Sequence, residues 1–167
     1  RTVYHLGRAY DAAEQYGLAR SQYEAAADMG SLIAINALGS LYEAGLGVDV
    51  DAAKAVEYYA QAAEGGLVVG IENLALAYEN GRGVAQDYEK AAELYREAID
   101  AGSTWAAGTL GWLTENGFGV DQDEVEAARL YRIAADAGHA FAQHNLGWMY
   151  SNGMGGLEAS DTKALEY

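Results

Sequence analysis

Residues 74–102 read LALAYENGRGVAQDYEKAAELYREAIDAG, and closely related strings precede and follow this stretch. Its opening pair recurs at Leu6-Gly7, Leu38-Gly39, Leu74-Ala75, Leu110-Gly111 and Leu146-Gly147. The last four pairs stand 36 residues apart, and the first stands 32 residues before the second. A period in this range is typical of stacked helical hairpins, in which neighbouring units bury a continuous core. Function should therefore be sought on a surface and not in an enclosed pocket.

Each repeat is predicted to form two helices joined by a glycine-rich turn. In residues 31–66, apolar side chains at helical spacing predict the first helix, with Ala34, Ala37, Leu38, Leu41 and Tyr42 on one stripe. Gly45 is placed to end this helix in the left-handed conformation, and Gly47 allows the chain to turn back. Asp51 is then placed to cap the second helix, as are Asp87 and Asp123 in the next repeats.

A small residue follows the leucine in every repeat and predicts close packing between the two helices. We expect Gly39, Ala75, Gly111 and Gly147 to let the second helix approach the first. The ring of Tyr59, Tyr95 or Tyr131 would fill the gap from the opposing helix. The same pattern predicts that a large side chain at Gly111 overpacks the hairpin.

The spacing divides the chain into a single array of five blocks. Residues 1–30 lack the glycine-rich turn and have the spacing of a short tetratricopeptide-like hairpin. Full 36-residue repeats follow at 31–66, 67–102 and 103–138, and 139–167 form a truncated repeat with a looser turn. Because the chain opens and closes inside repeats, we expect a fragment of a longer protein, and a signal or anchor could lie outside it.

Composition and charge limit the classes of partner. The chain has 167 residues, is 51% hydrophobic, and carries a net charge of −15 without any cysteine or proline. A negative charge of this size repels the phosphate backbone of DNA and RNA, so we expect no nucleic-acid partner. A basic or apolar protein or peptide is favoured as the partner. The charge could also serve solubility alone. We expect no disulfide, because the chain has no cysteine. We also expect no membrane span, because no apolar run reaches ~18 residues.

The recurring string resembles the Sel-1-like repeat family, which belongs to the tetratricopeptide-like superfamily. The resemblance is carried by residues 74–102, by 110–138 and by Asn145 to Gly153, and it covers nearly the whole chain. It implies an all-α fold, an α/α solenoid of antiparallel helical hairpins wound into a right-handed superhelix, with the first helices on the concave face. It also implies an adaptor or scaffold that binds proteins, often in bacterial envelopes, in signalling or at host contacts. The cysteine-rich, secreted branch of the family is not resembled.

A binding surface is predicted where the first helices face the groove that the resemblance implies. All three tryptophans lie at such positions in two adjacent repeats, and aromatic side chains are common anchors of recognition surfaces. We expect an extended peptide with apolar and basic side chains along this face. The candidate residues are Leu76, Glu79, Trp105, Trp112, Glu115, Asn116, Phe141, His144, Trp148 and Asn152. Trp105 and Phe141, near helix starts, could instead pack against the neighbouring hairpin.

The sequence gives little support for catalysis, a metal or a cofactor. His5, His139 and His144 lack the spacing of a metal site, and no cysteine is present as a nucleophile. Gly81-Arg82-Gly83-Val84 recurs as a hairpin turn and lacks the lysine that follows in a phosphate-binding loop. Two alternatives stay open: a regulatory or targeting region of a larger enzyme or signalling protein, and self-association through open repeat ends. A bacterial envelope or periplasmic location and a cytoplasmic one are both compatible with the sequence.

Overall fold

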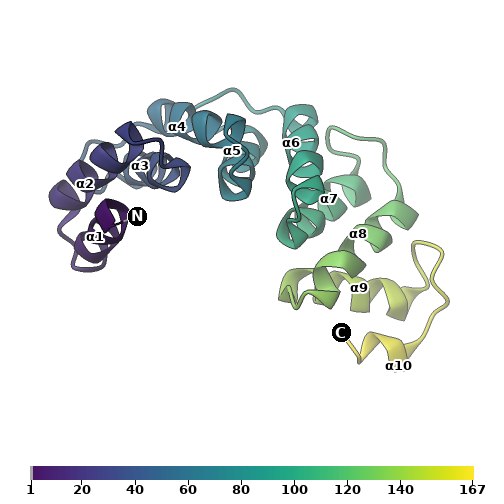
Figure 1. Ribbon diagram of the computed structural model, residues 1–167. Coiled ribbons are helices and arrows are strands. Elements are labelled where there is room, and N and C mark those ends of the chain that lie inside the picture. Colours follow the sequence, from purple (N-terminus) through teal and green to yellow (C-terminus); the bar gives the residue numbers. More distant parts are fainter. Residues whose placement is uncertain (1) are drawn as a thin grey trace. The chain divides into compact units, whose positions relative to one another are not determined.

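The computed structural model describes residues 2–167, and all regular secondary structure in this range is helical. The helices are α1 (Thr2–Ala12), α2 (Tyr16–Asp28), α3 (Leu32–Ala44), α4 (Ala52–Glu64), α5 (Val68–Asn80), α6 (Tyr88–Asp100), α7 (Thr104–Asn116), α8 (Glu124–Asp136), α9 (Ala140–Asn152) and α10 (Asp161–Ala164) (Figure 1). The predicted all-α fold is confirmed. Among these helices, none has the length and apolar character needed to cross a membrane.

The chain divides into two compact units, Arg1–Gln86 and Asp87–Tyr167. In the first unit α1 packs on α2, α2 on α3, α3 on α4 and α4 on α5. The core between α2 and α3 is small and apolar, and consists of Ala19, Tyr23, Ala26, Ala34, Leu38 and Leu41. Each helix therefore contacts mainly its neighbours in sequence, as expected of a repeat array.

The second unit repeats this arrangement with α6 to α10, again with each helix packed on the next. Figure 1 shows α7, α8 and α9 in green as closely spaced consecutive helices. Their core consists of Ala127, Ala128, Tyr131, Ala134, Ala135, Ala142, Leu146, Met149 and Tyr150. Many of these residues are alanines, so the helices come close together and the few large side chains fill the remaining space.

Local signals in the sequence set the helix ends. The carboxylates of Asp51, Asp87 and Asp123 accept hydrogen bonds from the backbone N–H three residues later, at 3.0, 2.9 and 3.0 Å. This confirms the predicted caps. α3, α5, α7 and α9 all end at a glycine in the left-handed conformation, with φ of 69, 66, 70 and 64°. The helix boundaries therefore recur with the sequence period.

The predicted contact between glycine and tyrosine is present within both units. A Cβ added at Gly39 would lie 2.6 Å from Cε1 of Tyr59, and one at Gly111 would lie 3.0 Å from Cδ1 of Tyr131. At Gly147 the nearest atom is the carbonyl oxygen of Ala164 in α10, at 3.1 Å. The missing side chain thus allows α4 to cross α3, and α8 to cross α7, at close range.

The second glycine of each turn has a role that the sequence did not predict. A Cβ at Gly83 would collide with the backbone carbonyl of Ala52, and one at Gly119 with the backbone of Tyr88. A Cβ at Gly47 would likewise lie 2.8 Å from the backbone carbon of Tyr16. The turn of each repeat is therefore seated on the start of the second helix of the preceding repeat.

Candidate protein-binding surface

The first helices of two adjacent repeats, α7 and α9, lie side by side in the second unit. A Cβ at Gly108 would be 3.7 Å from Cβ of Ala142. At the helix starts, Oγ1 of Thr104 lies 2.9 Å from Nε2 of His139. α7 carries the predicted residues Trp105, Trp112, Glu115 and Asn116, and α9 carries Phe141, His144, Trp148 and Asn152. Eight of the ten predicted residues therefore come from two neighbouring helices.

Trp105 and Phe141 occupy the same place in successive repeats. The Trp105 ring meets Tyr95 edge-on at 5.9 Å, and the Phe141 ring meets Tyr131 edge-on at 6.2 Å. Both tyrosines are buried, whereas Trp105 is 36% and Phe141 54% exposed. Each ring is therefore fixed by an aromatic contact to the preceding second helix and still presents apolar surface to solvent.

Trp148 is the most exposed of the three tryptophans, at 49%. It lines a hollow of about 620 Å³ between α9 and the C-terminal segment, together with His144 and Ser151 of α9. Leu165 and Tyr167 line the opposite side. An exposed indole beside a hollow is the kind of feature on which a partner side chain can be buried.

Trp112 is placed differently from Trp148, although the two are 36 residues apart. It is half-buried and packs against the core of α8 and α9. Its ring lies 5.2 Å from Phe118, which in turn stacks on Tyr88 at 5.1 Å. Much of the Trp112 side chain is therefore engaged within the unit.

The carboxylate of Glu115 takes part in an internal hydrogen bond. The hydroxyl of Tyr131 donates to Oε2 of Glu115 at 2.7 Å. The same bond recurs in the first unit, where the Tyr59 hydroxyl donates to Oε2 of Glu43 at 2.9 Å. Burial and, secondarily, the neighbouring carboxylate raise the pKa of Tyr131 above its usual range. Glu115 thus links α7 to α8 through this hydrogen bond, in addition to any contact it makes with a partner.

The asparagines at the ends of the first helices bond to their own helix. Nδ2 of Asn116 donates to the carbonyl of Trp112, and Nδ2 of Asn152 to that of Trp148, both at 2.8 Å. Both side chains are exposed beside the tryptophans.

Leu76 and Glu79 lie on α5, in the other unit, and both are half-buried. The other eight candidates all lie on α7 and α9 of the second unit. Within the described part of the chain, no group of three or more histidine or acidic side chains is placed to hold a metal ion.

Residues at the tips of the glycine-rich turns were missed by sequence reasoning. Arg82 lies between Gly81 and Gly83, and its Nη1 lies 3.2 Å from Oε1 of Glu43 on α3. The equivalent residue of the next turn is Phe118, and that of the last turn is Met154, which packs on the core of α8 and α9. The signal was the variable residue inside an otherwise constant Gly-x-Gly string.

Comparison with known proteins identifies the family. The family model described as Sel1 repeat matches residues 32–67, 69–103, 109–139 and 140–167. Among curated proteins, no sequence matches the chain significantly.

Solved structures similar to this chain come from several bacteria. The crystal structure of c5321, a protective antigen of uropathogenic Escherichia coli with an SLR fold, is 34% identical with a TM-score of 0.90 over 97% of this chain. A Sel1 repeat protein from Oxalobacter formigenes is 29% identical with a TM-score of 0.90 over 98%. Helicobacter pylori cysteine rich protein B is 23% identical with a TM-score of 0.56 over 74%, and shows the fold alone.

This chain spans 35% of the Escherichia coli chain, 66% of the Oxalobacter chain and 93% of the Helicobacter chain. The matched repeats cover most of its own length, and each begins at or near the start of a first helix or within it. The chain therefore belongs to the Sel1 repeat family.

Proposed function

We propose that the face formed by α7 and α9 binds an extended segment of a partner protein. Sel1 repeats generally mediate interactions between proteins and are generally non-catalytic scaffolds. The observation that carries the proposal is the row of exposed aromatic side chains on two adjacent helices, Trp105 and Phe141 at the helix starts and Trp148 beside a hollow. Rigid aromatic groups bury much area at low entropic cost, which is why they dominate binding energies.

The charge of the chain indicates which segments suit this face. The net charge is −15, and Asp161 lies on the same hollow as Trp148. A segment with aliphatic or aromatic side chains for the rings and lysine or arginine between them would match both features. An acidic segment would be repelled. The partner is therefore proposed to be apolar and basic.

The test begins with a displayed library of random short peptides selected against residues 1–167. The tightest peptide is labelled, and its affinity is measured by fluorescence anisotropy for the parent, Trp148→Ala and Phe141→Ala. We expect each substitution to weaken binding by about 30-fold, the effect of losing a ~2 kcal/mol anchor.

Val125→Ala is the matched control, because Val125 is 62% exposed but lies on α8. This variant should bind like the parent. If Trp148→Ala and Phe141→Ala bind as tightly as Val125→Ala, the proposed surface is wrong.

A further inference from the structure

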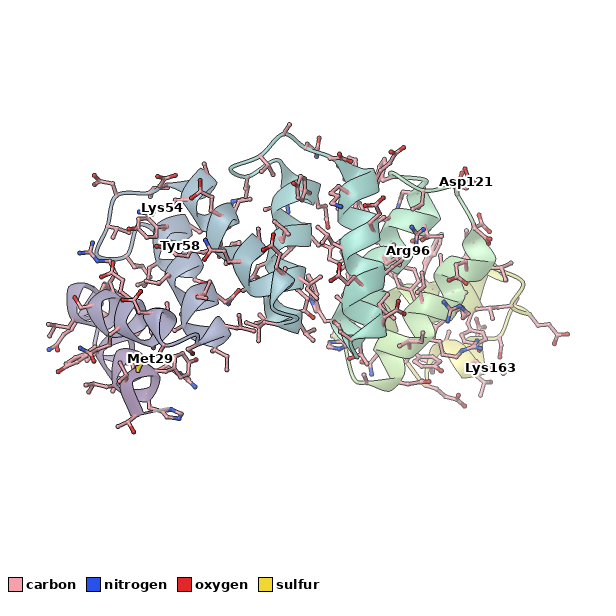
Figure 2. The ribbon with its side chains drawn as sticks, turned by 45° about the horizontal axis from the view of Figure 1, so that its top comes forward. Met29, Lys54, Tyr58, Arg96, Asp121 and Lys163 are labelled. Atoms are coloured by element: carbon pink, nitrogen blue, oxygen red, sulfur yellow. The ribbon has the colours of Figure 1, made fainter. Side chains whose placement is uncertain are left out.

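One position of the first helices breaks the repeat pattern in the second unit. The residues at this position are Tyr42, Tyr78, Thr114 and Tyr150, each 36 residues after the one before. In the first unit, the Tyr42 ring stacks on Tyr58 of α4 at 5.7 Å, with an interplanar angle of 23°. Nζ of Lys54 lies 4.3 Å from the Tyr42 ring and donates to its hydroxyl at 3.0 Å. Lys54 and Tyr58 are labelled in Figure 2.

Tyr150 has equivalent surroundings at the other end of the chain. Its ring stacks on Tyr167 at 6.0 Å with an interplanar angle of 7°, and Nζ of Lys163 lies 5.4 Å from it. Nη2 of Arg132, on the second helix of the preceding repeat, donates to the Tyr150 hydroxyl at 2.8 Å. In both places a tyrosine is held by a stacked ring and by cationic side chains.

Of the two repeats that lie between these, the one formed by α7 and α8 has replaced all of these groups except one. Thr114 stands for the tyrosine, Leu130 for the stacked ring, and Glu126 for the lysine. The Thr114 hydroxyl turns back to donate to the carbonyl of Leu110 at 2.8 Å. In place of the ring there is a hollow of about 680 Å³, lined by Leu110, Thr114 and Leu130 and also by the acidic side chains of Glu89, Asp121, Asp123 and Glu126.

The group that is retained is an arginine. Arg96 stands 36 residues before Arg132 and lines the hollow, and it is labelled together with Asp121 in Figure 2. Among the described residues Arg96 has neither a hydrogen bond nor a close ion pair and is attracted only by the charge of Glu126, whereas Arg132 bonds the Tyr150 hydroxyl. Glu126 is already bonded to Arg129 at 2.6 and 2.7 Å. The guanidinium of Arg96 therefore lines the hollow, but the tyrosine hydroxyl that accepts the equivalent bond from Arg132 is replaced by Thr114 in this repeat.

We infer that this hollow binds the phenol ring of a tyrosine side chain from a partner protein. Leu110 and Leu130, which are 4% and 2% exposed, supply the apolar contact at the bottom of the hollow, and Arg96 supplies a donor for the phenol oxygen. A basic side chain is the competing occupant, because Glu89, Asp121, Asp123 and Glu126 also line the hollow, and the guanidinium of Arg96 opposes it. The site shares no residue with the aromatic face on α7 and α9, so it does not depend on the function proposed above.

The test is an NMR titration of the whole chain with N-acetyltyrosinamide, followed through the methyl groups of Leu110, Thr114 and Leu130. N-acetylphenylalaninamide, which lacks the hydroxyl, is titrated in parallel. We expect both probes to shift these methyls, and the tyrosine probe to bind more tightly. Arg96→Met should weaken the tyrosine probe about tenfold and leave the phenylalanine probe unchanged, because only the former bonds to the guanidinium.

Two substitutions at Thr114 distinguish loss of binding because the hollow is filled from loss of binding because the protein is misfolded. Thr114→Tyr restores the ring found in the other repeats and should abolish the shifts at Leu110 and Leu130. Thr114→Ser leaves the hollow open and should bind the tyrosine probe like the parent, as should Trp148→Ala.

Three results would overturn the inference. These are the absence of methyl shifts in the parent, equal weakening of both probes by Arg96→Met, and tighter binding of N-acetylargininamide than of the tyrosine probe.

Discussion

Gly111 is the residue on which the α7–α8 hairpin closes. The Tyr131 ring passes so near its Cα that an added Cβ would meet the ring at 3.0 Å. Gly111→Leu should therefore overpack the hairpin and lower the free energy of unfolding by about 1–3 kcal/mol. Urea denaturation of the variant and the parent measures the difference.

Gly17 offers a control for this substitution, because it also lies within a helix and has no atom within 4 Å of an added Cβ. Gly17→Leu should be neutral or stabilising, since leucine is the better helix former. Equal stability of the Gly111→Leu variant and the parent would contradict the packing described for this hairpin.

Tyr59 makes the stability of the first unit depend on pH in the alkaline range. Burial, opposed by a hydrogen bond to Ser40 and supported by the Glu43 carboxylate, raises the pKa of Tyr59 to about 12 from 10.0. Because the folded state holds this proton more tightly than the unfolded state, its contribution to stability is complete below pH 10 and is lost as the pH rises towards 12.

Urea denaturation at several pH values between 9 and 12 should show this loss, flagged by phenolate absorbance. Tyr59→Phe removes the titrating group, so its stability should fall less steeply over the same range. A parallel fall in the parent and in Tyr59→Phe would exclude Tyr59 as the cause.

At the scale of the element, each glycine-rich turn contains two glycines with different structural roles. Gly117 and Gly119 have φ of 70 and 67°, so alanine at either position is strained by about 1–2 kcal/mol. Only Gly119 also lies on the backbone of Tyr88 and Glu89. Gly119→Ala should therefore destabilise the chain more than Gly117→Ala, by about 1–3 kcal/mol.

The two variants serve as controls for each other, because the backbone strain is common to both. Thermal unfolding followed by circular dichroism gives the comparison. Equal melting temperatures would mean that the contact with the preceding repeat contributes nothing.

The cap of α8 is a second local device. Asp123 accepts from the backbone N–H of both Val125 and Glu126, at 2.9 and 3.0 Å. Asp123→Ala should cost about 1 kcal/mol of stability. Asp121→Ala removes the same charge two residues away and should cost less, whereas an equal loss from both would point to charge and not to capping.

Helices and caps could be predicted because their signals are local. Asp51, Asp87 and Asp123 stand one residue before a helix, and Gly45 stands directly after one. The partial burial of Trp112 could not be predicted in this way, because it depends on a contact with Phe118 in the following turn. The hollow beside Thr114 could not be predicted for a related reason. Its lining includes Arg96 of the preceding repeat, so the sequence of a single repeat does not reveal it.

At the scale of the whole molecule, the dominant property is charge. A net charge of −15 on 167 residues favours the expanded, unfolded chain through self-repulsion. Ion pairs such as Arg20 with Glu24, Lys90 with Glu93 and Arg129 with Glu126 lie within one helix and are exposed to solvent. Raising sodium chloride from about 20 to about 300 mM should therefore increase the urea midpoint, since screening weakens the repulsion more than it weakens these pairs.

Sucrose at matched osmolality controls for effects unrelated to charge. A urea midpoint that falls with salt would mean that attractive pairs outweigh the repulsion.

The seat of each turn on the preceding repeat has a consequence for how such arrays can change. At Gly83 and Gly119 the turn contacts backbone atoms at the start of the second helix of the preceding repeat, and a backbone is the same whatever side chains it carries. The joint therefore makes little demand on the sequence of the repeat that receives it. Repeats joined in this way can be duplicated, exchanged or diversified one at a time, and the outer side chains can diverge while the joint stays intact.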